Sequence, residues 1–446
     1  MTTPSRGTVV AGLLLAAFVI RLPTLGYPLV EAHAFRQTQT AITAVVYHRD
    51  GIDLLHTPMP TIGPPWQLPF EFPLFQGAAA LVMDVGLGVE PAVRLTNLVL
   101  FMVTALAIVW LLREFGQEAL TIPVLVAYLF SPFALEWSRA SIIDYLAVAP
   151  TLGAIAAARR AETTGRSRWW VLAAVLGVVS ALVKITTAVI WLVAALVIAR
   201  GRRPMVLVCA IAFAAGFVWT EYADSIRQTG PLTRLFSSST LTTWTLGAPL
   251  DRIDPTLWAL WIWHLTPLGV IGLIGLVFIR AVPGDRRLWV LSTIAMALAY
   301  AVFPTLFAQH SYYAVAVSPA VALLLGAAWR GAILARPRRF VLIATAALAV
   351  GTFAVSLPKW IVAFGPADPD HELVSAAQIQ AATSPTDRVL IIGRDYSPAI
   401  LFYADRQGIA LPLAASVTDL PADLVAGYRR FDCGIDRAGD CVAITP

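Results

Sequence analysis

Apolar segments close to twenty residues long recur along most of this chain, and they constrain its fold more than any other feature. About twenty consecutive apolar residues let a helix cross the roughly 30 Å hydrocarbon core of a membrane. Only 13% of the 446 residues are charged, whereas a soluble domain typically carries about 25%. The pattern therefore predicts a polytopic α-helical membrane protein.

The apolar segments predict about eleven membrane-spanning helices. They lie at residues 8–22, 93–112, 119–135, 142–159, 169–184, 186–200, 204–221, 263–280, 288–306, 313–329 and 340–357. A further apolar segment, residues 74–87, is short and contains Asp84. We expect a re-entrant or surface-lying helix there.

Basic residues indicate how the spans are oriented. Many of the arginines lie in four clusters between spans: Arg159, Arg160, Arg166 and Arg168; Arg200, Arg202 and Arg203; Arg280, Arg286 and Arg287; Arg330, Arg336, Arg338 and Arg339. With the N-terminus in the cytoplasm, every cluster falls on the cytoplasmic side, as the positive-inside rule requires. The same count places residues 23–92, 222–262 and 358–446 outside. Counting residues 74–87 as a span would place all four clusters outside. The clustering also argues against nucleic-acid binding, which needs a continuous basic face with exposed aromatic residues.

The last part of the chain differs in composition from the rest. We divide the sequence into a membrane module, residues 1–357, and an extracytoplasmic soluble tail, residues 358–446. In the tail, residues 371–382 and 397–406 have helical patterns, and residues 388–393 read as a buried strand. These patterns predict a small α/β domain. It lacks a GxGxxG fingerprint, so we do not interpret it as nucleotide-binding.

Two cysteines in the tail test the predicted orientation independently. Cys433 and Cys441 are separated by seven residues, and such a pair forms a disulfide where the compartment is oxidising. A zinc site is the alternative, but no other Cys or His lies close by in the sequence. The predicted topology places the pair outside, where a disulfide persists.

Ionisable residues cluster where spans meet the predicted outer surface. Charges at the membrane are costly, so they are candidates for function. Four outer positions carry them. With the neutral Gln37 included, the candidates are Glu31, His33, Arg36, Gln37 and Glu71 in the first outer segment; Arg139 and Asp144 at the second; Lys184 at the third; and His310, Tyr312 and Tyr313 at the fourth. We expect Glu31, Asp144 and His33 to be catalytic and the other eight to bind substrate.

These residue types suit a site for a lipid phosphate. A carboxylate, Glu31 or Asp144, can accept a proton from an acceptor hydroxyl. Cationic side chains can neutralise a phosphate leaving group; the candidates are Arg36, Arg139, Lys184 and His310. The alternative for any one residue is a solvated or snorkelling side chain at a helix end, and Glu71 alone could cap the next helix. Four positions on one membrane face are harder to explain in that way.

Several of these segments together resemble one family. The motifs are Glu31-x-His33-x-Phe35-Arg36-Gln37-Thr38-x-Thr40, Phe70-Glu71-Phe72-Pro73, Asp144, His310-x-Tyr312-Tyr313 with Pro319, and Ser397-Pro398 with Leu401-Phe402-Tyr403 and Arg406-x-Gly408. The order of these motifs along the chain and the membrane side predicted for them resemble those of the GT-C glycosyltransferases. The nearest branch includes glycosyltransferase family 39, the protein mannosyltransferases and the lipid A aminoarabinose transferases.

The resemblance implies a GT-C-like bundle and a glycosyltransferase of the cell envelope. Such enzymes move a sugar from a polyprenyl-phosphate carrier to a glycan, glycolipid or protein outside the cytoplasmic membrane, usually with inversion. The family's catalytic base maps to Glu31 and its second carboxylate to Asp144. Many members have Asp at the first position, so Glu31 with His33 leaves open whether Glu31 acts directly or through His33. The first outer loop has no DxD cluster, and we predict no cofactor and no metal requirement.

Two alternatives from other classes stand beside this prediction. A transporter or lipid flippase would place its binding site near the midplane of the membrane and often contains internal repeats. No repeat is visible, and the polar residues gather at the outer face rather than inside the spans. A non-catalytic binding or assembly protein with the same fold is the second alternative. We expect a multi-pass protein of a bacterial cytoplasmic membrane that contacts membrane lipid.

Overall fold

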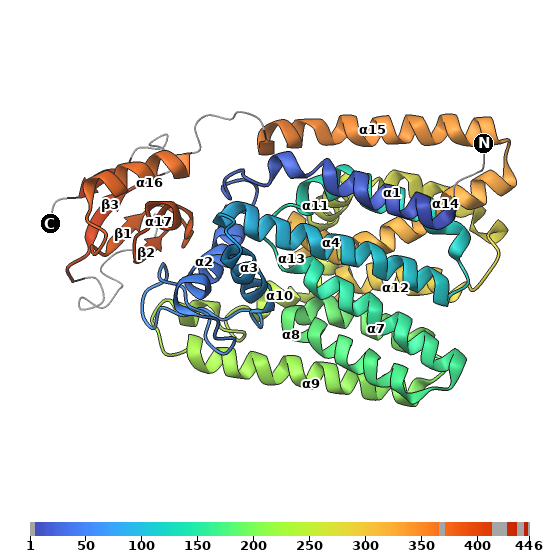
Figure 1. Ribbon diagram of the computed structural model, residues 1–446, viewed down its shortest axis with the longest axis horizontal. Coiled ribbons are helices and arrows are strands. Elements are labelled where there is room, and N and C mark those ends of the chain that lie inside the picture. Colours follow the sequence, from blue (N-terminus) through green and yellow to red (C-terminus); the bar gives the residue numbers. More distant parts are fainter. Residues whose placement is uncertain (1–4, 365–370, 413–425, 435–440, 445–446) are drawn as a thin grey trace.

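The structure, a computed structural model, describes residues 5–364, 371–412, 426–434 and 441–444. Long helices lie alongside one another and form a bundle, and a small domain with a β-sheet lies beyond one end of it (Figure 1). The architecture confirms the predicted fold class, a polytopic helical module followed by a small C-terminal α/β domain.

The α-helices of the bundle and its loops are α1 (Arg6–Val19), α2 (Ala34–Asp50), α3 (Leu74–Asp84), α4 (Val89–Glu114), α5 (Thr121–Phe130), α6 (Pro132–Trp137), α7 (Asp144–Thr164), α8 (Ser167–Ile198), α9 (Arg202–Arg227), α10 (Thr242–Leu246), α11 (Pro255–Leu265), α12 (Arg287–Val302), α13 (Pro304–Gln309), α14 (Ser318–Ala335) and α15 (Arg338–Phe364). The 3-10 helices are η1 (Leu22–Thr24), η2 (Glu118–Leu120), η3 (Thr233–Phe236), η4 (Pro249–Ile253), η5 (Thr266–Leu268), η6 (Val270–Ala281) and η7 (Ser311–Ala316).

Each predicted span coincides with one or more of these helices. By length and composition alone, the described residues contain six helices able to cross a membrane, or seven if one bent pair is a single span. The bent pair covers the span predicted at 263–280, where α11 and η6 meet at 80°. Gly269 lies at the break with a φ of 78°, a left-handed conformation that glycine adopts without steric cost. Hydropathy does not reveal such a bend.

Helix α8 is a hairpin of two spans rather than one long helix. Lys184 interrupts it with φ −156° and ψ 92°, between the spans predicted at 169–184 and 186–200. Its two ends return to the same end of the bundle. A Cβ on Gly201 would lie 3.0 Å from the Trp170 ring, and the Arg200 amide donates to Glu162 at 2.7 Å. Lys184 therefore lies at the tip of the hairpin.

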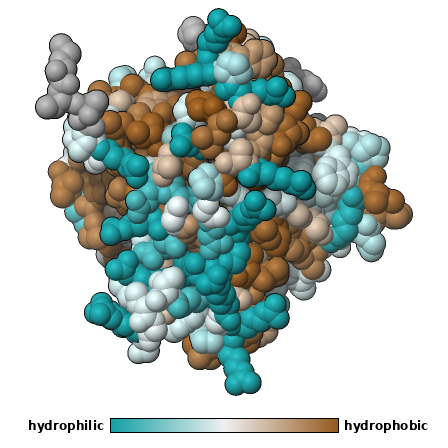
Figure 2. All heavy atoms as spheres, turned by 90° about the vertical axis from the view of Figure 1, so that its right-hand side faces the viewer, coloured by the Kyte–Doolittle hydropathy of each residue, from teal (hydrophilic) through white to brown (hydrophobic). Residues whose placement is uncertain are grey.

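The four arginine clusters gather at the end of the bundle away from Lys184, which we call the arginine end. Arg159 forms ion pairs with Glu162 and with Asp285, both at 3.1 Å. Arg287 also reaches Glu162, at 3.7 Å, and Arg336 stacks over the ring of Phe278. Figure 2 views this end, where hydrophilic side chains gather between apolar surfaces. One face thus collects the clusters that the sequence places between spans.

Helices α2 and α3 cover the opposite end of the bundle, which we call the site end (Figure 1). Helix α3 has only 11 residues and packs on α2 and α4. Its apolar side chains, including Phe75, Ala79 and Met83, are buried against those neighbours. A short helix therefore occurs in residues 74–87, as expected; its re-entrant or surface-lying placement stays a prediction.

The C-terminal domain contains a four-stranded sheet in the order β2-β1-β3-β4. Its elements are α16 (His371–Ala382), β1 (Val389–Ile392), α17 (Ala399–Ala404), β2 (Gly408–Leu411), β3 (Arg429–Asp432) and β4 (Val442–Ile444). Strands β2 and β3 run parallel to β1, whereas β4 is antiparallel to β3. A buried core of aliphatic residues from α16, α17 and the sheet holds the domain together.

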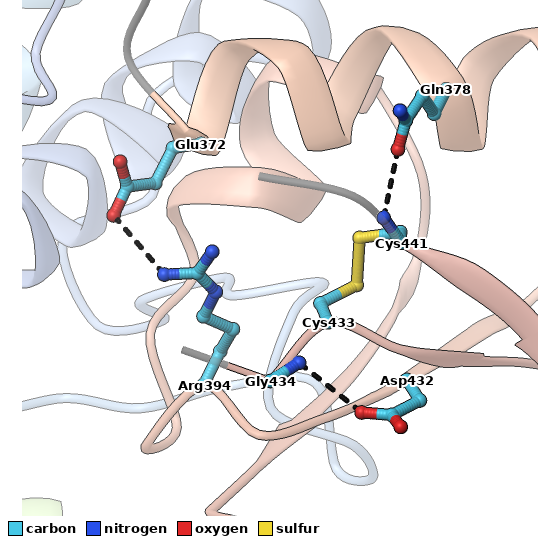
Figure 3. Close-up of a disulfide and its surroundings, with 7 residues drawn as sticks. All are labelled: Glu372, Gln378, Arg394, Asp432, Cys433, Gly434 and Cys441. Carbon is cyan, nitrogen blue, oxygen red and sulfur yellow. Dashed lines mark hydrogen bonds and ion pairs between the residues drawn. A yellow bond between two sulfur atoms is a disulfide. The ribbon is translucent and has the colours of Figure 1, made fainter. Parts of the chain in front are cut away.

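A disulfide between Cys433 and Cys441 connects the segments after β3 and before β4 (Figure 3). The Gln378 side chain of α16 accepts a hydrogen bond from the Cys441 amide at 2.8 Å. The Asp432 carboxylate accepts one from the Gly434 amide at 3.1 Å. The disulfide therefore joins the two segments at the sheet edge, and the Gln378 hydrogen bond connects them to α16. The free cysteine in the described residues, Cys209, is buried in α9.

Candidate functional site

Residues from all four predicted outer positions meet around one side chain at the site end, Tyr312 of η7. Its buried ring lies 5.0 Å from the His33 ring and 5.5 Å from the His310 ring, edge to face in both cases. The Lys184 ammonium is 5.2 Å from its centroid. Arg36 and Asp144 are close enough to act electrostatically on its hydroxyl. Residues from four distant parts of the sequence therefore share one centre.

His33 directly precedes α2, at its N-cap position, in a left-handed conformation with φ 58° and ψ 44°. A non-glycine residue rarely adopts this conformation, which costs about 1–3 kcal/mol and concentrates at functional sites. Its Nε2 hydrogen bonds with the Ser311 hydroxyl at 3.1 Å, which directs the ring toward η7. Burial lowers the pKa of the His33 imidazole to about 4, with a smaller contribution from His264. His33 is therefore neutral at pH 7.

His310 stacks on His33, with ring centroids 5.2 Å apart. Its Nδ1 is buried and has no hydrogen-bond partner among the described residues. Trp244 of α10 lies edge to face against it at 5.5 Å. Burial lowers the pKa of His310 to about 4, and the neighbouring His33 and Lys184 act in the same direction. A neutral His310 can give a phosphate a hydrogen bond but not a positive charge.

Asp144 and Lys184 form a buried ion pair between α7 and the tip of the α8 hairpin. Lys184 Nζ contacts Asp144 Oδ1. The Asp144 side chain is fully buried, and its Oδ2 has no hydrogen-bond partner among the described residues. Asp144 lies in the first turn of α7, where the helix dipole favours a negative charge. The ammonium also lies 3.8 Å from the Tyr313 ring centroid, a cation–π contact.

Arg36 and Glu71 form a second pair, between α2 and the loop before α3. Arg36 Nη2 donates to Glu71 Oε2 at 2.9 Å, and its Nη1 donates to Gln39 at 2.6 Å. Gln76 donates to the other oxygen of Glu71 at 2.8 Å. The Glu71 side chain is only 5% exposed, so these hydrogen bonds replace the water contacts that burial removes.

Glu31 is held by two arginines. Arg139 Nη1 lies 2.9 Å from Glu31 Oε1, and Arg94 Nη2 lies 3.3 Å from the same oxygen. Arg94 is fully buried and also donates to the carbonyls of Tyr27 and Pro28, at 3.1 and 2.7 Å. The Arg94 guanidinium thus holds both the Glu31 carboxylate and the backbone at Tyr27 and Pro28.

The sequence prediction included Arg139 but missed Arg94. A signal for it exists, because Arg94 lies inside the apolar span predicted at 93–112, where a charge is costly. Gln37 was predicted to bind substrate. In the structure its amide donates to the Ala32 carbonyl at 3.0 Å and its carbonyl accepts from the Ser141 amide at 3.0 Å. Its hydrogen bonds connect the start of α2 to the loop before α7.

The site therefore offers three carboxylates, each beside a cation, around aromatic and neutral histidine rings. An ammonium has three N–H donors and a guanidinium five, so Lys184 and Arg36 retain donors beyond their carboxylate contacts. Such an arrangement can bind an anion while a carboxylate accepts a proton. Within the described residues, no three His, Cys, Asp or Glu side chains come together as a metal site. Metal independence stays a prediction.

An apolar cavity of about 460 Å³ lies between α6 and α15. It is lined by Pro132, Ala349, Val350, Phe353, Ala354, Ser356 and Leu357. From Pro132, helix α6 continues to Trp137, whose ring lies 5.7 Å from the His33 ring and 5.9 Å from the Tyr312 ring. A short helix thus connects the cavity to the polar site.

No protein-family model and no curated protein match the sequence. Solved structures do resemble the fold. ArnT from Cupriavidus metallidurans, bound to undecaprenyl phosphate, superposes with a TM-score of 0.63 at 14% identity, covering 93% of this chain and 88% of that one. The oligosaccharyltransferase AglB from Archaeoglobus fulgidus, in complex with an inhibitory peptide and a dolichol-phosphate, has a TM-score of 0.55 at 13% identity. That comparison covers 95% of this chain and 69% of AglB.

A third neighbour is the arabinofuranosyltransferase AftD from Mycobacteria, with a TM-score of 0.50 at 14% identity. It covers 93% of this chain and 34% of AftD. All three neighbours have the GT-C fold. This chain therefore has the GT-C-like membrane fold that its motifs predict, and the likeness at these identities concerns the fold alone.

The Asp144–Lys184 pair gives a stability prediction. Replacing Lys184 with Met leaves a buried carboxylate without its cation, which typically costs about 3–5 kcal/mol. We expect Lys184→Met to lower the unfolding temperature of the purified protein in detergent. The double variant Lys184→Met with Asp144→Asn removes both charges and should recover most of that loss. Equal unfolding temperatures for the single and the double variant would contradict the pairing.

Proposed function

We propose that this protein is a membrane glycosyltransferase that moves a sugar from a polyprenyl-phosphate donor to an extracytoplasmic acceptor with inversion. The acceptor is a glycan, glycolipid or protein of the cell envelope. The observation that carries the proposal is the meeting of Asp144, Arg36 and Lys184 near Tyr312 at one end of a GT-C fold. Glu31 lies two residues before His33, whose ring contacts Tyr312. The support for the proposal from the comparisons is the ArnT structure with bound undecaprenyl phosphate.

In the proposed reaction, Glu31 accepts the proton of the acceptor hydroxyl. The oxygen then bonds to the anomeric carbon of the sugar on the face opposite the phosphate. The bond from that carbon to the phosphate oxygen breaks, and its electron pair leaves with the polyprenyl phosphate. Lys184 and Arg36 stabilise the developing charge on the phosphate, and Asp144 holds Lys184 in place. Attack from the opposite face inverts the anomeric configuration.

The contacts of Glu31 favour its direct action over a relay through His33. Its carboxylate is positioned by Arg94 and Arg139, and His33 hydrogen bonds with Ser311 instead. We assign His33 the role of shaping the site, because its imidazole ring contacts the neighbouring aromatic rings and hydrogen bonds with Ser311. The isoprenoid chain of the donor is proposed to occupy the apolar cavity between α6 and α15, because its lining suits a hydrocarbon chain.

The assignment of the base is tested by Glu31→Gln. The amide keeps the shape of the carboxylate but cannot take a proton, so transfer from a polyprenyl-phosphate sugar should fall by about 100-fold or more. The measurement is product formation by the purified protein in lipid nanodiscs. Asp53→Asn is the matched control, because Asp53 lies in the same outer segment but is exposed and paired with His56. It should leave transfer unchanged.

Near-normal transfer by Glu31→Gln would contradict the assignment of the base. The purified protein in sealed proteoliposomes tests the transporter alternative, because a nanodisc does not separate two compartments. Movement of a polyprenyl-phosphate lipid across the bilayer without any glycosidic product would support a flippase. Absence of both activities with every donor sugar would favour a non-catalytic protein of this fold.

We further propose that the protein lies in a bacterial cytoplasmic membrane with its N-terminus inside and its C-terminal domain outside. The gathering of the arginine clusters at one end supports this orientation, and so does the disulfide at the other.

Cysteine labelling of sealed cells measures the orientation. In a Cys209→Ala background, Ser239→Cys lies in an exposed loop at the site end, and Thr163→Cys lies at the exposed last turn of α7 at the arginine end. A membrane-impermeant maleimide should label Ser239→Cys in intact cells and Thr163→Cys only after permeabilisation. The reverse pattern would overturn the orientation.

A further inference from the structure

The C-terminal domain contacts the segment that carries Glu31. The Tyr403 hydroxyl of α17 accepts a hydrogen bond from the Leu29 amide at 2.6 Å. Leu29 is two residues before Glu31 and fully buried. The contact joins positions 374 residues apart in the sequence, so it forms only when the domain docks on the membrane module.

Neighbouring residues of α17 and β2 complete this docking. Phe402 packs against apolar clusters of the module that contain Leu29 and Ile62. The Gly408 amide donates to the Pro60 carbonyl at 2.9 Å, and Ile409 forms an antiparallel bridge with Ile62. A Cβ on Gly408 would lie 2.0 Å from the Val389 carbonyl oxygen. Only glycine therefore fits at position 408, where the chain hydrogen bonds both with β1 and with the segment around Pro60.

The tail motif therefore divides into two sets of contacts. Phe402, Tyr403 and Gly408 reach the outer loop, as described above. Arg406 stays within the domain, where its guanidinium donates to the Thr383 carbonyl at 2.9 Å and to the Thr383 hydroxyl at 2.9 Å. The Tyr403 ring packs on the core of the domain, whereas its hydroxyl contacts the backbone of the membrane module.

The segment before Glu31 is fixed from two sides. On one side, Arg94 binds the carbonyls of Tyr27 and Pro28 and reaches the Glu31 carboxylate. On the other, Tyr403 binds the amide of Leu29. Burial raises the pKa of Tyr403, and the carboxylate of Glu90 acts in the same direction, so the hydroxyl keeps its proton. Backbone groups on both sides of Pro28 are thus held by side chains.

We propose that Tyr403 is a positioning residue for Glu31, through which the docked C-terminal domain sets the geometry of the reaction. The proposal rests on the proposed function, because it takes Glu31 as the base. Tyr403 acts on the reaction through the Leu29 amide and the short chain segment that follows it. Misplacing a catalytic group by about 1 Å can cost about 100-fold in rate. The loss of one hydrogen bond behind Glu31 can therefore lower turnover without unfolding the protein.

The first test measures the contact without any activity. Hydrogen–deuterium exchange of the full-length protein in nanodiscs follows a peptide containing the Leu29 amide. Tyr403→Phe removes the acceptor hydroxyl and keeps the ring, so this amide should exchange about tenfold faster, the effect of one lost hydrogen bond. Tyr428→Phe is the matched control. Tyr428 belongs to the same domain, and its hydroxyl has no hydrogen-bond partner among the described residues.

The second test measures transfer by the same variants. Tyr403→Phe should lower kcat by about tenfold with little change in the apparent KM for the donor, because the hydroxyl positions the base rather than the lipid. Tyr428→Phe should keep both constants. The unfolding temperature of each variant, measured in parallel, should stay close to that of the wild type.

The outcomes separate this proposal from the proposed function. Unchanged exchange at Leu29 in Tyr403→Phe would overturn the positioning role, whatever the activity. An unchanged kcat would do the same, and so would a rise in KM at constant kcat. Faster exchange at Leu29 in a protein whose wild type transfers no sugar would instead overturn the proposed function.

Discussion

The site end of the molecule depends on the pairing of buried carboxylates with cations. Asp144, Glu71 and Glu31 are all largely or fully removed from water. A buried charge without a partner is strongly destabilising, whereas a paired one is tolerated. Each pair also joins different parts of the chain, since Lys184 comes from the α8 hairpin and Arg36 from α2. The contacts that hold these parts of the chain together at the site end therefore also build the site.

Much of the fold follows from the sequence, because the length of an apolar segment and the position of nearby arginines can be read without knowing how the helices pack. The two halves of α8 and the short helix α3 are visible as apolar segments of suitable length. The bend at Gly269 is not visible, because composition does not record direction. The clustering of candidates at one end was also predictable, since each lies where a span ends on the same side.

The partners within the site could not be predicted. Arg36 pairs with Glu71 across 35 positions, and His33 meets Ser311 across 278. Such contacts depend on how the helices pack, and the spacing of residues along the sequence does not reveal that packing. The resemblance to a family maps the catalytic base to Glu31, and His33 two residues later leaves a relay through its imidazole open. In the structure Glu31 instead contacts two arginines, one of which lies within an apolar span. The role of the C-terminal domain was equally hidden, because Tyr403 and Leu29 come together only through docking.

The account's central claim is that a polyprenyl phosphate binds at the site end between Lys184, Arg36 and Glu31. The most direct measurement is a cryo-EM structure of the protein in nanodiscs saturated with undecaprenyl phosphate. The account predicts phosphate density within hydrogen-bond distance of Lys184 Nζ and the Arg36 guanidinium, with the isoprenoid chain leading toward α6 and α15. Phosphate density at the arginine end, with the site around Tyr312 left unchanged, would contradict it.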